Sequence, residues 1–504
     1  MQKRLSALLD NCNIILHVGK NPFDNNVIVE DINYDSRRVT KNSLFFALKG
    51  IHTDGHDYIE TAIKNGASAV FVSKVPVKID NNISYILVDD TRKVMSFISS
   101  AFYDHPSKKL KTIGITGTDG KSTTVSFTYQ LLNMLGKKTG FISTVEYDSS
   151  GTIKKNPYRQ STPEAPEIMK FLFEMVSNNL EYAVIESTSH GLSDKTSRLT
   201  SVRYNAGILT NISHEHLEFH GTMENYINDK ANLFRKAEDF CVVNYDEPAK
   251  SVFLSASAVP VLSYSLNDSN ADIYSSSITL TKIGSQFNVH CYGKNLKAEL
   301  CIPGIFNIEN FFAAAIAVSK ITNIDIEEII PLSIKLKPVT GRMDIVDMGQ
   351  NFTVIVDYAH TPGSFTKIFP MIKKSVKKRL ISVFGSAGER DIEKRAVQGK
   401  IASEYSNILI LTDEDPRGEN SIDIINQIES GIIKGFDKAS VYKISDRQTA
   451  IDKAMEIAQP GDTVILLGKG HEGSIIYKDK PIPWNERESA IKALAKIGYV
   501  RDQN

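Results

Sequence analysis

This sequence of 504 residues has only four cysteines and no formal net charge. The four cysteines are scattered, without a CxxC pair or the dense spacing of secreted disulfide frameworks, so a reducing compartment is favoured. Lys plus Arg and Asp plus Glu both number 59, and no overall field therefore attracts the chain to nucleic acid or to an anionic membrane. Any anionic ligand has to be bound by a local cluster of charge.

Long hydrophobic runs are also absent. No stretch reaches the roughly 18 apolar residues of a membrane span. The N-terminus begins with basic residues, but Asp10, Asn11 and Asn13 interrupt its apolar run before the core of a signal peptide forms. We therefore expect a cytoplasmic protein with no membrane and no nucleic-acid partner.

The length and composition predict several α/β domains. Domains often have about 150 residues, and a content of 41% hydrophobic and 23% charged residues is enough for a core in each of three. Near the N-terminus, NSLFFALKG and SAVFVSK have the pattern of short buried strands, and HDYIETAIKNGA between them has helical spacing. The domains are expected at residues 1–105, 106–340 and 341–504.

The second domain contains a strand, a glycine-rich loop and a helix in succession. TIGITG has the pattern of a buried strand, GTDGKS is the loop, and a helical pattern follows that Gly136 closes. YAVIEST and NAGILTNIS are further apolar runs that end in polar residues, as parallel strands buried on both faces do. Residues 259–300 alternate in polarity, which predicts antiparallel strands before an apolar helix.

Four apolar runs in the third domain end in loops rich in Gly, Asp, His or Arg. They are FTVIVDYAH, RLISVFGSAG, NILILTDEDPRGE and DTVILLGKGHE, and helical stretches separate them. This alternation is typical of a doubly wound, Rossmann-like α/β domain whose strand ends carry the site.

The loop GITGTDGKST is typical of a phosphate-binding site. Its glycines let backbone N–H groups turn toward phosphate oxygens, Lys121 adds a positive charge, and the Ser122 hydroxyl can ligate Mg²⁺. Because Ile115 stands five positions before Gly120, the loop is a variant of GxxxxGK[ST]. A glycine-rich turn that carries a surface lysine is the alternative. A kinase, a GTPase switch or a ligase would fit, although no Asn-Lys-x-Asp string for guanine is present.

Acidic and histidine residues follow two predicted strands of the second domain. Glu186, at the end of YAVIEST, is placed to hold Mg²⁺ beside the loop, or is a solvated carboxylate. HEHLEFHG brings His214, His216 and His220 together, but the HExxH pattern fits from neither of the first two, which disfavours zinc proteolysis. Ordinary capping and packing histidines are the alternative.

Ten motifs of this sequence resemble motifs of the Mur ligases, and they occur in the same order as in that family. They are GTDGKS, ESTSHGL, TNISHEHLEFHG, YINDKANLF, GIFNIENFFAA, GRMD, DYAHTP, GSAGERD, DEDPRGE and GKGHE. The resemblance extends from about residue 35 to residue 472, and it is closest to the branch of the family that adds the third peptide residue.

The resemblance implies a three-domain α/β architecture. The first domain would bind the UDP sugar, a central P-loop ATPase-type domain would bind ATP, and the third would bind the incoming amino acid. ATP would phosphorylate the D-glutamate side-chain carboxylate of UDP-MurNAc-L-Ala-D-Glu, and the amino group of a diamino acid would attack the acyl phosphate. Activation in this way gives a poor electrophile a leaving group. The enzyme is expected to be a monomer of peptidoglycan precursor synthesis.

The resemblance also implies roles for residues of the central domain. Lys121 neutralises phosphate oxygens, Ser122 and Glu186 match ligands of one Mg²⁺, and His216 matches a ligand of a second. Lys230, otherwise an ordinary exposed helix residue, matches a lysine that carries a CO₂-derived carbamate, and carbamate oxygens can ligate a metal whereas an ammonium cannot. The implied ATP contacts are Gly117, Thr118, Asp119, Gly120, Lys121, Ser122, Thr123, Asn307, Arg342 and Asp357.

A second set of residues matches the family's contacts to the UDP sugar and dipeptide. The arginine of HGLSDKTSRL, Arg198, stands two positions later than in some relatives. The implied contacts are Ser36, Ile51, His52, Thr53, Gln160, Ser161, Thr162, Thr188 and Arg198.

A third set matches the site of the incoming amino acid. Relatives that use meso-diaminopimelate usually have DNPR, whereas Asp415 replaces the asparagine here. Its carboxylate would repel a distal carboxylate and favours lysine or ornithine, unless Arg417 neutralises it; Arg417 itself favours diaminopimelate, the second choice. The implied contacts are Arg390, Glu414, Asp415, Arg417, Gly468 and Glu472.

Two other functions remain alternatives at this point. One is a related ligase such as folylpolyglutamate synthetase, although DSRRV and FFALKGIHTDGHDYI resemble the UDP-binding unit that folate enzymes lack. The other is a nucleotide-dependent switch, which would hydrolyse ATP slowly and make no amide.

Overall fold

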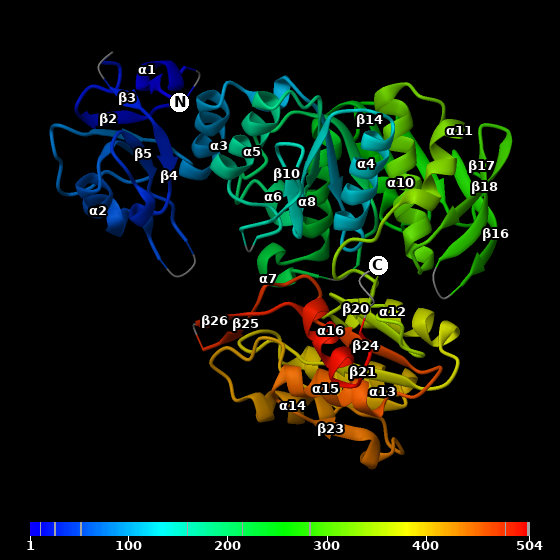
Figure 1. The fold of residues 1–504 in the computed structure, drawn as a ribbon. Coiled ribbons are helices and arrows are strands. Elements are labelled where there is room, and N and C mark those ends of the chain that lie inside the picture. The colour runs from blue at the N-terminus through cyan, green and yellow to red at the C-terminus, as the bar shows by residue number, and fades with distance from the viewer. Residues whose placement is uncertain are drawn as a thin grey trace. The chain divides into compact units, whose positions relative to one another are not determined.

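The structure is a computed structural model that describes residues 1–10, 12–24, 27–50, 53–158, 160–213, 215–281, 284–478 and 480–500. The protein is a mixed α/β molecule (Figure 1). Its backbone divides into two compact units. The first comprises Met1–Ile273 and Phe312–Ile329, and the second comprises Tyr274–Phe311 and Ile330–Asn504.

A five-stranded sheet forms the N-terminal part of the first unit. The elements here are β1 (Lys3–Arg4), α1 (Leu5–Leu8), β2 (Leu16–Gly19), β3 (Ile28–Val29), β4 (Asp31–Asn33), β5 (Ser43–Phe46), α2 (Ile59–Lys64), β6 (Ala67–Val72), β7 (Ser84–Leu87) and α3 (Thr91–Phe102). The sheet order is β2-β7-β6-β5-β4, with β4 to β7 parallel and β2 antiparallel to β7. The predicted strands NSLFFALKG and SAVFVSK form β5 and β6, with α2 between them, which confirms the prediction.

Eight more strands of the first unit lie side by side, with β8 among the inner ones. They are β8 (Lys111–Thr116), β9 (Thr139–Ile142), β10 (Glu146–Asp148), β11 (Lys154–Lys155), β12 (Tyr182–Glu186), β13 (Tyr204–Leu209), β14 (Ala237–Asn244) and β15 (Val261–Ser265). They are neighbours in the order β11-β10-β9-β12-β8-β13-β14-β15, and the six from β9 onward are parallel. The C-terminal ends of β8, β12 and β13 therefore meet at one edge, where the glycine-rich loop and Glu186 follow.

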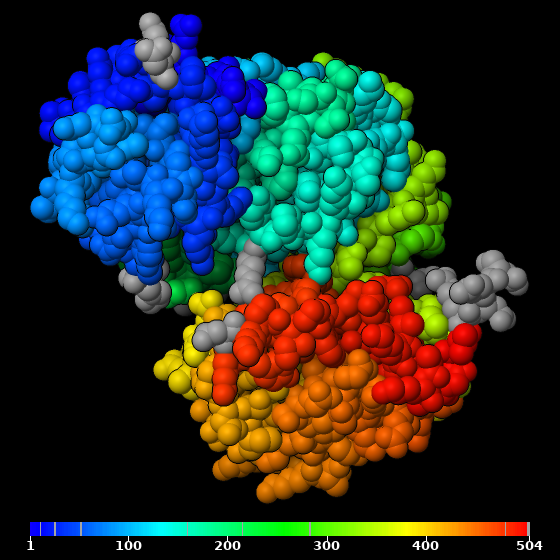
Figure 2. Space-filling model, turned by 60° about the vertical axis from the view of Figure 1, so that its left-hand side comes forward, coloured from blue at the N-terminus to red at the C-terminus, as the bar shows by residue number. Residues whose placement is uncertain are grey.

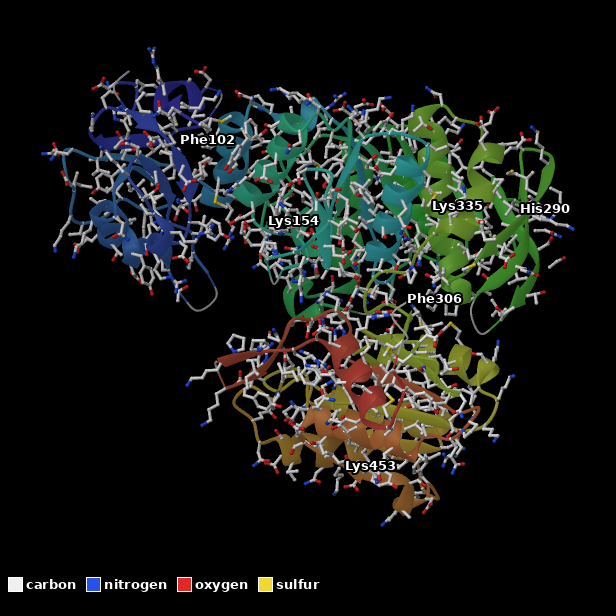
Figure 3. The ribbon with its side chains drawn as sticks, viewed as in Figure 1. Phe102, Lys154, His290, Phe306, Lys335 and Lys453 are labelled. Carbon is white, nitrogen blue, oxygen red and sulfur yellow. The ribbon has the colours of Figure 1, made fainter. Side chains whose placement is uncertain are left out.

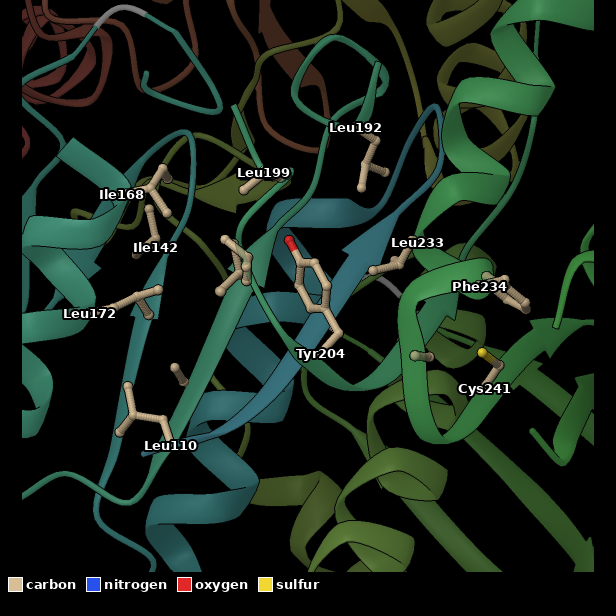
Figure 4. Close-up of a cluster of buried hydrophobic side chains, with 14 of the residues drawn as sticks. Leu110, Ile142, Ile168, Leu172, Leu192, Leu199, Tyr204, Leu233, Phe234 and Cys241 are labelled. Carbon is tan, nitrogen blue, oxygen red and sulfur yellow. The ribbon is translucent and has the colours of Figure 1, made fainter. Parts of the chain in front are cut away.

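Helices cover the faces of these strands. They are α4 (Lys121–Met134), α5 (Ala165–Ser177), α6 (Ser189–Leu192), α7 (Leu217–His220), α8 (Met223–Lys236) and α9 (Lys250–Ala256). Figure 4 shows side chains from strands and helices that converge on one buried core, among them Tyr204 of β13, Leu172 of α5 and Leu233 of α8. Because Leu233 is locked into this core, Lys230 one turn earlier on α8 is held against the end of β8.

The second unit contains a doubly wound sheet, as predicted. Its strands are β19 (Asp344–Ile345), β20 (Thr353–Asp357), β21 (Leu380–Phe384), β22 (Ile408–Leu411), β23 (Val441–Lys443) and β24 (Thr463–Leu467). The order is β19-β20-β24-β21-β22-β23, and all but β19 are parallel. The helices are α12 (Pro362–Ser375), α13 (Glu393–Tyr405), α14 (Ser421–Glu429), α15 (Arg447–Ile457) and α16 (Glu486–Lys496).

Alternate residues of the parallel strands face opposite layers of this unit. Leu409 and Leu411 pack with α12, α13 and α14, whereas Ile408 and Ile410 pack with α15 and α16. This alternation explains why the strands are continuously apolar in sequence. The orange and red residues of this part form one continuous mass in Figure 2.

The remaining elements come from residues 273–329 and 474–483, and the part from Phe312 to Ile329 belongs to the first unit. They are β16 (Ile273–Leu280), β17 (Ser285–Cys291), β18 (Lys294–Leu300), α10 (Ile305–Thr322), α11 (Ile326–Ile329), β25 (Ser474–Tyr477) and β26 (Lys480–Pro483). β17 and β18 are antiparallel, as the alternating pattern predicts. In the described part of the chain, α10 alone is long and apolar enough to cross a membrane by length and composition, but 67% of it is buried, as in a core helix.

Candidate active site

The glycine-rich loop joins β8 to the first turn of α4. Gly117 has φ of +145°, and a Cβ there would lie 1.9 Å from Oγ1 of Thr210, so a larger residue does not fit. Gly120 precedes α4 with φ of +81° and makes no side-chain cap. The first N–H groups of α4 are therefore left for an anion, where the helix dipole favours negative charge.

The loop that follows β13 fixes the shape of the glycine-rich loop. The N–H of Thr118 donates to the carbonyl of Asn211 (2.8 Å), and the N–H of Asp119 donates to Oδ1 of Asn211 (3.0 Å). The hydroxyl of Thr118 pairs with the hydroxyl of Tyr226 on α8 at 2.8 Å. These contacts fix the shape of the loop. Thr123 lies in the first turn of α4.

Glu186 lies buried at the end of β12, beside the loop. The hydroxyl of Ser122 donates to Oε2 at 2.8 Å. Thr144, which follows β9, donates from its N–H to Oε2 (2.9 Å) and from its hydroxyl to Oε1 (2.8 Å). The solvated carboxylate considered above is therefore wrong, and the hydroxyl and carboxylate form a pair of hard oxygen donors that suits Mg²⁺.

Lys230 is a fully buried lysine of α8, not a solvated helix residue. Its ammonium donates to the carbonyl of Gly117 at 2.5 Å and lies 4.6 Å from the ring centroid of Tyr226. Burial, followed by the charge of Lys121, lowers its pKa well below the ordinary value. Lys121 itself donates to the carbonyl of Thr118 at 2.7 Å. The geometry places two lysines on the same loop, and the pKa of the buried one is lowered.

Three histidines pack together next to α8. His216 immediately precedes α7 and has φ of +58°, and its ring nitrogens lie 3.7 Å from Glu215 and 3.6 Å from Glu218. His190 of α6 lies between His216 and His220, with ring centroids 4.8 and 5.3 Å away. Burial and the neighbouring histidines lower the pKa of His190 to about 3, so it is neutral. His214 lies outside the described residues.

The donor set decides how a metal ion could be held here. Within the described ranges, no three His, Cys, Asp or Glu side chains converge on one point. Ser122 with Glu186, and the half-exposed His216, supply donors of the right chemistry. A carbamate on Lys230 would add anionic oxygens beside Gly117, and the residues therefore fit Mg²⁺.

The residues predicted to bind the UDP sugar and dipeptide fall in several places of the first unit. Thr162 and Thr188 pair through their hydroxyls at 2.9 Å, and Arg198 donates to the carbonyl of Thr162 at 3.1 Å. Arg198 also forms an ion pair with Glu164 at 2.8 Å, so its guanidinium is already held in place. Ser161 is half-buried, Gln160 and Thr53 are exposed, Ser36 is buried at the start of a 3-10 turn, and Ile51 and His52 lie outside the described residues.

Three predicted ATP contacts lie in the second unit. Asn307 is buried and donates to the carbonyl of Pro303 at 2.7 Å. The guanidinium of Arg342 stacks 4.5 Å over the ring of Tyr358, and its Nε has no hydrogen-bond partner within the described part of the chain. The carboxylate of Asp357 accepts the N–H groups of Met343 and Ala359, each at 2.8 Å.

The predicted amino-acid contacts gather at the ends of β22 and β24. Asp415 does not pair with Arg417; the buried ammonium of Lys469 donates to its Oδ1 at 2.8 Å and also pairs with Glu472. Burial lowers the pKa of Lys469, but Glu472 and Asp415 outweigh this effect and raise it. Glu472 also accepts from the hydroxyl of Tyr358 at 3.1 Å.

The other members of this set differ in burial. Glu414 is buried below Gly468, and burial raises its pKa. Its Oε2 has no hydrogen bond to any described residue. Arg417 has φ of +54°, and its buried Nε has no hydrogen-bond partner in the ranges that the structure describes. Arg390 is exposed. The structure therefore brings five of the six predicted residues to the ends of β22 and β24, the two strands that flank β21 in one sheet.

Models of one protein family match most of the chain. They are the Mur ligase family catalytic domain at residues 29–103, the Mur ligase middle domain at 115–318 and the Mur ligase glutamate ligase domain at 341–470. The chain belongs to the Mur ligase family. It is an ATP-dependent ligase with the α/β architecture that the sequence motifs imply.

Relatives and a solved structure agree with this assignment. The UDP-N-acetylmuramyl-tripeptide synthetase of Borrelia garinii subsp. bavariensis is 50% identical over 475 residues, which cover 93% of each chain. The UDP-N-acetylmuramoyl-L-alanyl-D-glutamate–2,6-diaminopimelate ligase 1 of Clostridium acetobutylicum is 37% identical and covers 94% of this chain and 96% of its own. A solved UDP-N-acetylmuramoyl-L-alanyl-D-glutamate–2,6-diaminopimelate ligase has a TM-score of 0.64 at 27% identity, over 93% of this chain and 95% of its own.

The sequence motifs of this Mur ligase did not point to every residue at the site. Thr144 follows an ordinary strand and becomes a partner of Glu186 only through the sheet order. Lys469 stands between Gly468 and Glu472 in GKGHE, so its position in a predicted motif was the available signal. His190 and His220 were visible as histidines, but their mutual packing depends on the tertiary fold.

Proposed function

We propose that this Mur ligase adds a diamino acid, lysine or ornithine rather than meso-diaminopimelate, as the third residue of UDP-MurNAc-L-Ala-D-Glu. The relative from Borrelia garinii is named as a tripeptide synthetase, and 50% identity over nearly all of both chains supports the same reaction. The observation that carries the proposal is the convergence of Lys121, Ser122, Glu186 and Lys230 on one loop. That set suits a reaction in which ATP activates a carboxylate.

The chain's residues would act on ATP through charge and position. The N–H groups at the start of α4 and the ammonium of Lys121 bind phosphate oxygens, which would otherwise repel the substrate carboxylate. Ser122 and Glu186 would hold one Mg²⁺, and His216 with a carbamylated Lys230 would hold a second. The metal ions supply electrophilic stabilisation of the transferring phosphoryl group. The D-glutamate carboxylate attacks the γ-phosphorus, ADP leaves, and the amine then displaces phosphate from the acyl carbon.

Lys230 has the properties that carbamate formation requires. Its burial disfavours the ammonium, and only the neutral amine has a lone pair for CO₂. The amine nitrogen attacks the carbon of CO₂, an N–C bond forms, and one proton leaves to solvent. The product is an anion next to Lys121, so the charge conflict between the two lysines turns into an attraction.

The charge balance near Glu472 supports a basic substrate. Asp415 and Glu472 share the single ammonium of Lys469, which leaves one negative charge in excess. A distal ammonium of lysine or ornithine would compensate that charge. The guanidinium of Arg417, whose Nε finds no hydrogen-bond partner among the described residues, suits the α-carboxylate. A second carboxylate, as in diaminopimelate, would be repelled by the excess negative charge.

The remaining features of the proposal concern the whole chain. We place the UDP-sugar domain at residues 1–105, the ATP domain at 106–340 and the amino-acid domain at 341–504. The enzyme would work as a monomer in the cytoplasm on precursors of the bacterial cell wall.

A panel of amino acids tests the proposal. Purified enzyme receives ATP, UDP-MurNAc-L-Ala-D-Glu and one of lysine, ornithine or meso-diaminopimelate, and phosphate and amide product are measured together. Phosphate release should require both acceptors and be fastest with lysine or ornithine. Dominant turnover of diaminopimelate would reject the substrate, and phosphate release without amide would reject the ligase reaction.

A further inference from the structure

A buried chain of hydrogen bonds crosses the first unit beside the three histidines. Nδ1 of His220 lies 2.7 Å from Oδ2 of Asp229, and Nε2 of His220 lies 3.0 Å from the hydroxyl oxygen of Ser189. His220 and Ser189 are both 1% exposed. A buried polar chain of this kind is stable only if every member is satisfied, and here each one is.

The order of donors in this chain follows from chemistry. An ionised carboxylate only accepts, so Nδ1–H of His220 donates to Asp229, and Nε2 is left as the acceptor for the Ser189 hydroxyl. The arrangement has the order of a hydrolytic Ser-His-Asp triad. However, Ser189 is closed off from solvent, and no substrate carbonyl can reach it. These hydrogen bonds therefore have a structural role and not a hydrolytic one.

Each of the three hydrogen-bonded residues lies close in sequence to a proposed metal ligand. Ser189 begins α6, three residues after Glu186. His220 ends α7, which His216 precedes. Asp229 comes immediately before Lys230 on α8. One histidine therefore ties together three segments that come from different parts of the chain.

Two amide side chains tie the same segments together without touching a proposed ligand. Nδ2 of Asn225 on α8 donates to the carbonyl of His220 at 3.0 Å, and Nδ2 of Asn232 donates to the carbonyl of Leu192 on α6 at 3.0 Å. The second bond joins α8 to α6 independently of His220. Loss of the histidine should therefore loosen the spacing of the segments and leave the fold intact.

We propose that His220 is a positioning residue, which sets the spacing of Glu186, His216 and Lys230 through its hydrogen bonds to Ser189 and Asp229. The inference rests on the proposed Mg²⁺ site. Residues that orient metal ligands without touching the metal are typically worth about 10- to 100-fold in metal affinity or activity. We expect an effect of that size on metal binding, with little change in the affinity for the UDP-dipeptide.

Two variants separate positioning from folding. His220→Gln keeps a polar group near Ser189 but loses the bond to Asp229, and Ser189→Ala removes the other bond with a smaller change. His290→Gln is the matched control, because His290 also hydrogen-bonds a serine, Ser276, at 2.7 Å, and lies on β17 (Figure 3). Each variant is first checked for an unchanged circular dichroism spectrum and thermal midpoint.

Metal binding is then measured directly by Mn²⁺ titration calorimetry with a non-hydrolysable ATP analogue. Carbamate on Lys230 is followed by ¹³C NMR with ¹³C-bicarbonate. Both site variants should bind Mn²⁺ about 10-fold or more weakly and show less carbamate, and the His290 control should match the wild type. High Mg²⁺ should restore turnover in Ser189→Ala.

The outcomes are separable. A folded Ser189→Ala or His220→Gln enzyme with wild-type Mn²⁺ affinity would overturn the positioning role and leave the proposed function intact. A wild-type enzyme that binds no Mn²⁺ and forms no carbamate would overturn both. If His220→Gln unfolds, Ser189→Ala alone decides the question.

Discussion

At the scale of single residues, close approach decides which side chains the site tolerates. Gly117 lies so near Thr210 that even a methyl group does not fit. Lys230 lies so deep in the core that burial lowers its pKa well below the ordinary value. Ser122 and Thr144 are short enough to reach Glu186 from two directions. The chemistry of the site therefore depends on a few positions where side-chain size and burial allow no other residue.

Gly117→Ala should weaken nucleotide binding. The added Cβ would lie 1.9 Å from Oγ1 of Thr210, and φ of +145° is unfavourable for alanine. We expect ADP affinity, measured by calorimetry, to fall at least about 10-fold, the effect of roughly 1.4 kcal/mol. Gly136→Ala is the control, because Gly136 also has positive φ (+73°) but open space at its Cβ. Equal ADP affinity in the two variants would contradict the steric explanation.

Glu419 predicts how the stability of the protein depends on acid. Hydrogen bonds from the buried guanidinium of Arg395 lower the pKa of Glu419 to about 2. A carboxylate with a lowered pKa stabilises the fold above the unfolded pKa of 4.5, and this contribution is lost as the pH falls toward about 2. Glu419→Gln should cost about 1.5–3 kcal/mol at neutral pH.

Urea unfolding at several pH values checks this sign. The wild type should lose its advantage over Glu419→Gln between about pH 4.5 and pH 2. A difference that stays constant over this range would contradict the assignment.

At the scale of elements, the ends of parallel strands assemble the site. In the second unit, the guanidinium of Arg447 donates to the carbonyls of Asp413 and Leu467, which lie next to the predicted residues Glu414 and Gly468. Its charge is balanced by Glu486 of α16, and both side chains are fully buried. The loops after β22 and β24 are thus held to one helix by a single ion pair.

Glu486→Gln should therefore destabilise the second unit strongly. It leaves the buried guanidinium of Arg447 without a counterion, which typically costs about 3–5 kcal/mol. Glu429→Gln is the control, because Glu429 pairs with Lys443 at 2.9 Å on the surface and should cost less than about 1 kcal/mol. Chemical denaturation of both variants gives the comparison, and similar losses would show that burial is not the cause.

Local patterns were enough to predict some elements and not others. The strand, loop and helix around Lys121 are contiguous, so sequence spacing alone predicted β8 and α4. Asp415 was considered a partner of Arg417, two residues away, whereas its partner is Lys469, 54 residues away on another strand end. The order of β22, β21 and β24 decides that pairing, and sequence periodicity carries no information about strand order.

Lys230 is a second residue whose environment could not be predicted from local sequence patterns. Its polar helix predicts an exposed lysine, because Lys is seldom fully buried. Burial comes from neighbours on β8 and in the glycine-rich loop, which are over 100 residues away in sequence; Lys230 and its acceptor Gly117 are 113 positions apart. Only the family motif pointed to a special role for this residue.

At the scale of the whole molecule, the proposed reaction has to combine two units. Lys121, Glu186 and Lys230 belong to the first, and Arg417, Lys469 and Glu472 belong to the second. The amine of the incoming amino acid must reach an acyl group next to the glycine-rich loop. Substrate binding should therefore bring the units together.

Small-angle scattering tests this expectation. A non-hydrolysable ATP analogue together with UDP-MurNAc-L-Ala-D-Glu should reduce the radius of gyration relative to the free enzyme. The Gly117→Ala variant should show no reduction under the same conditions. An unchanged radius for the liganded wild type would argue against closure.

The transfer of oxygen from substrate to phosphate tests the central claim most directly. UDP-MurNAc-L-Ala-D-Glu is labelled with ¹⁸O in the D-glutamate side-chain carboxylate, and the phosphate released during amide formation is analysed by mass spectrometry. If ATP activates this carboxylate at the loop of Lys121, one labelled oxygen should appear in each phosphate released. Phosphate that contains no label while amide is formed would contradict the account.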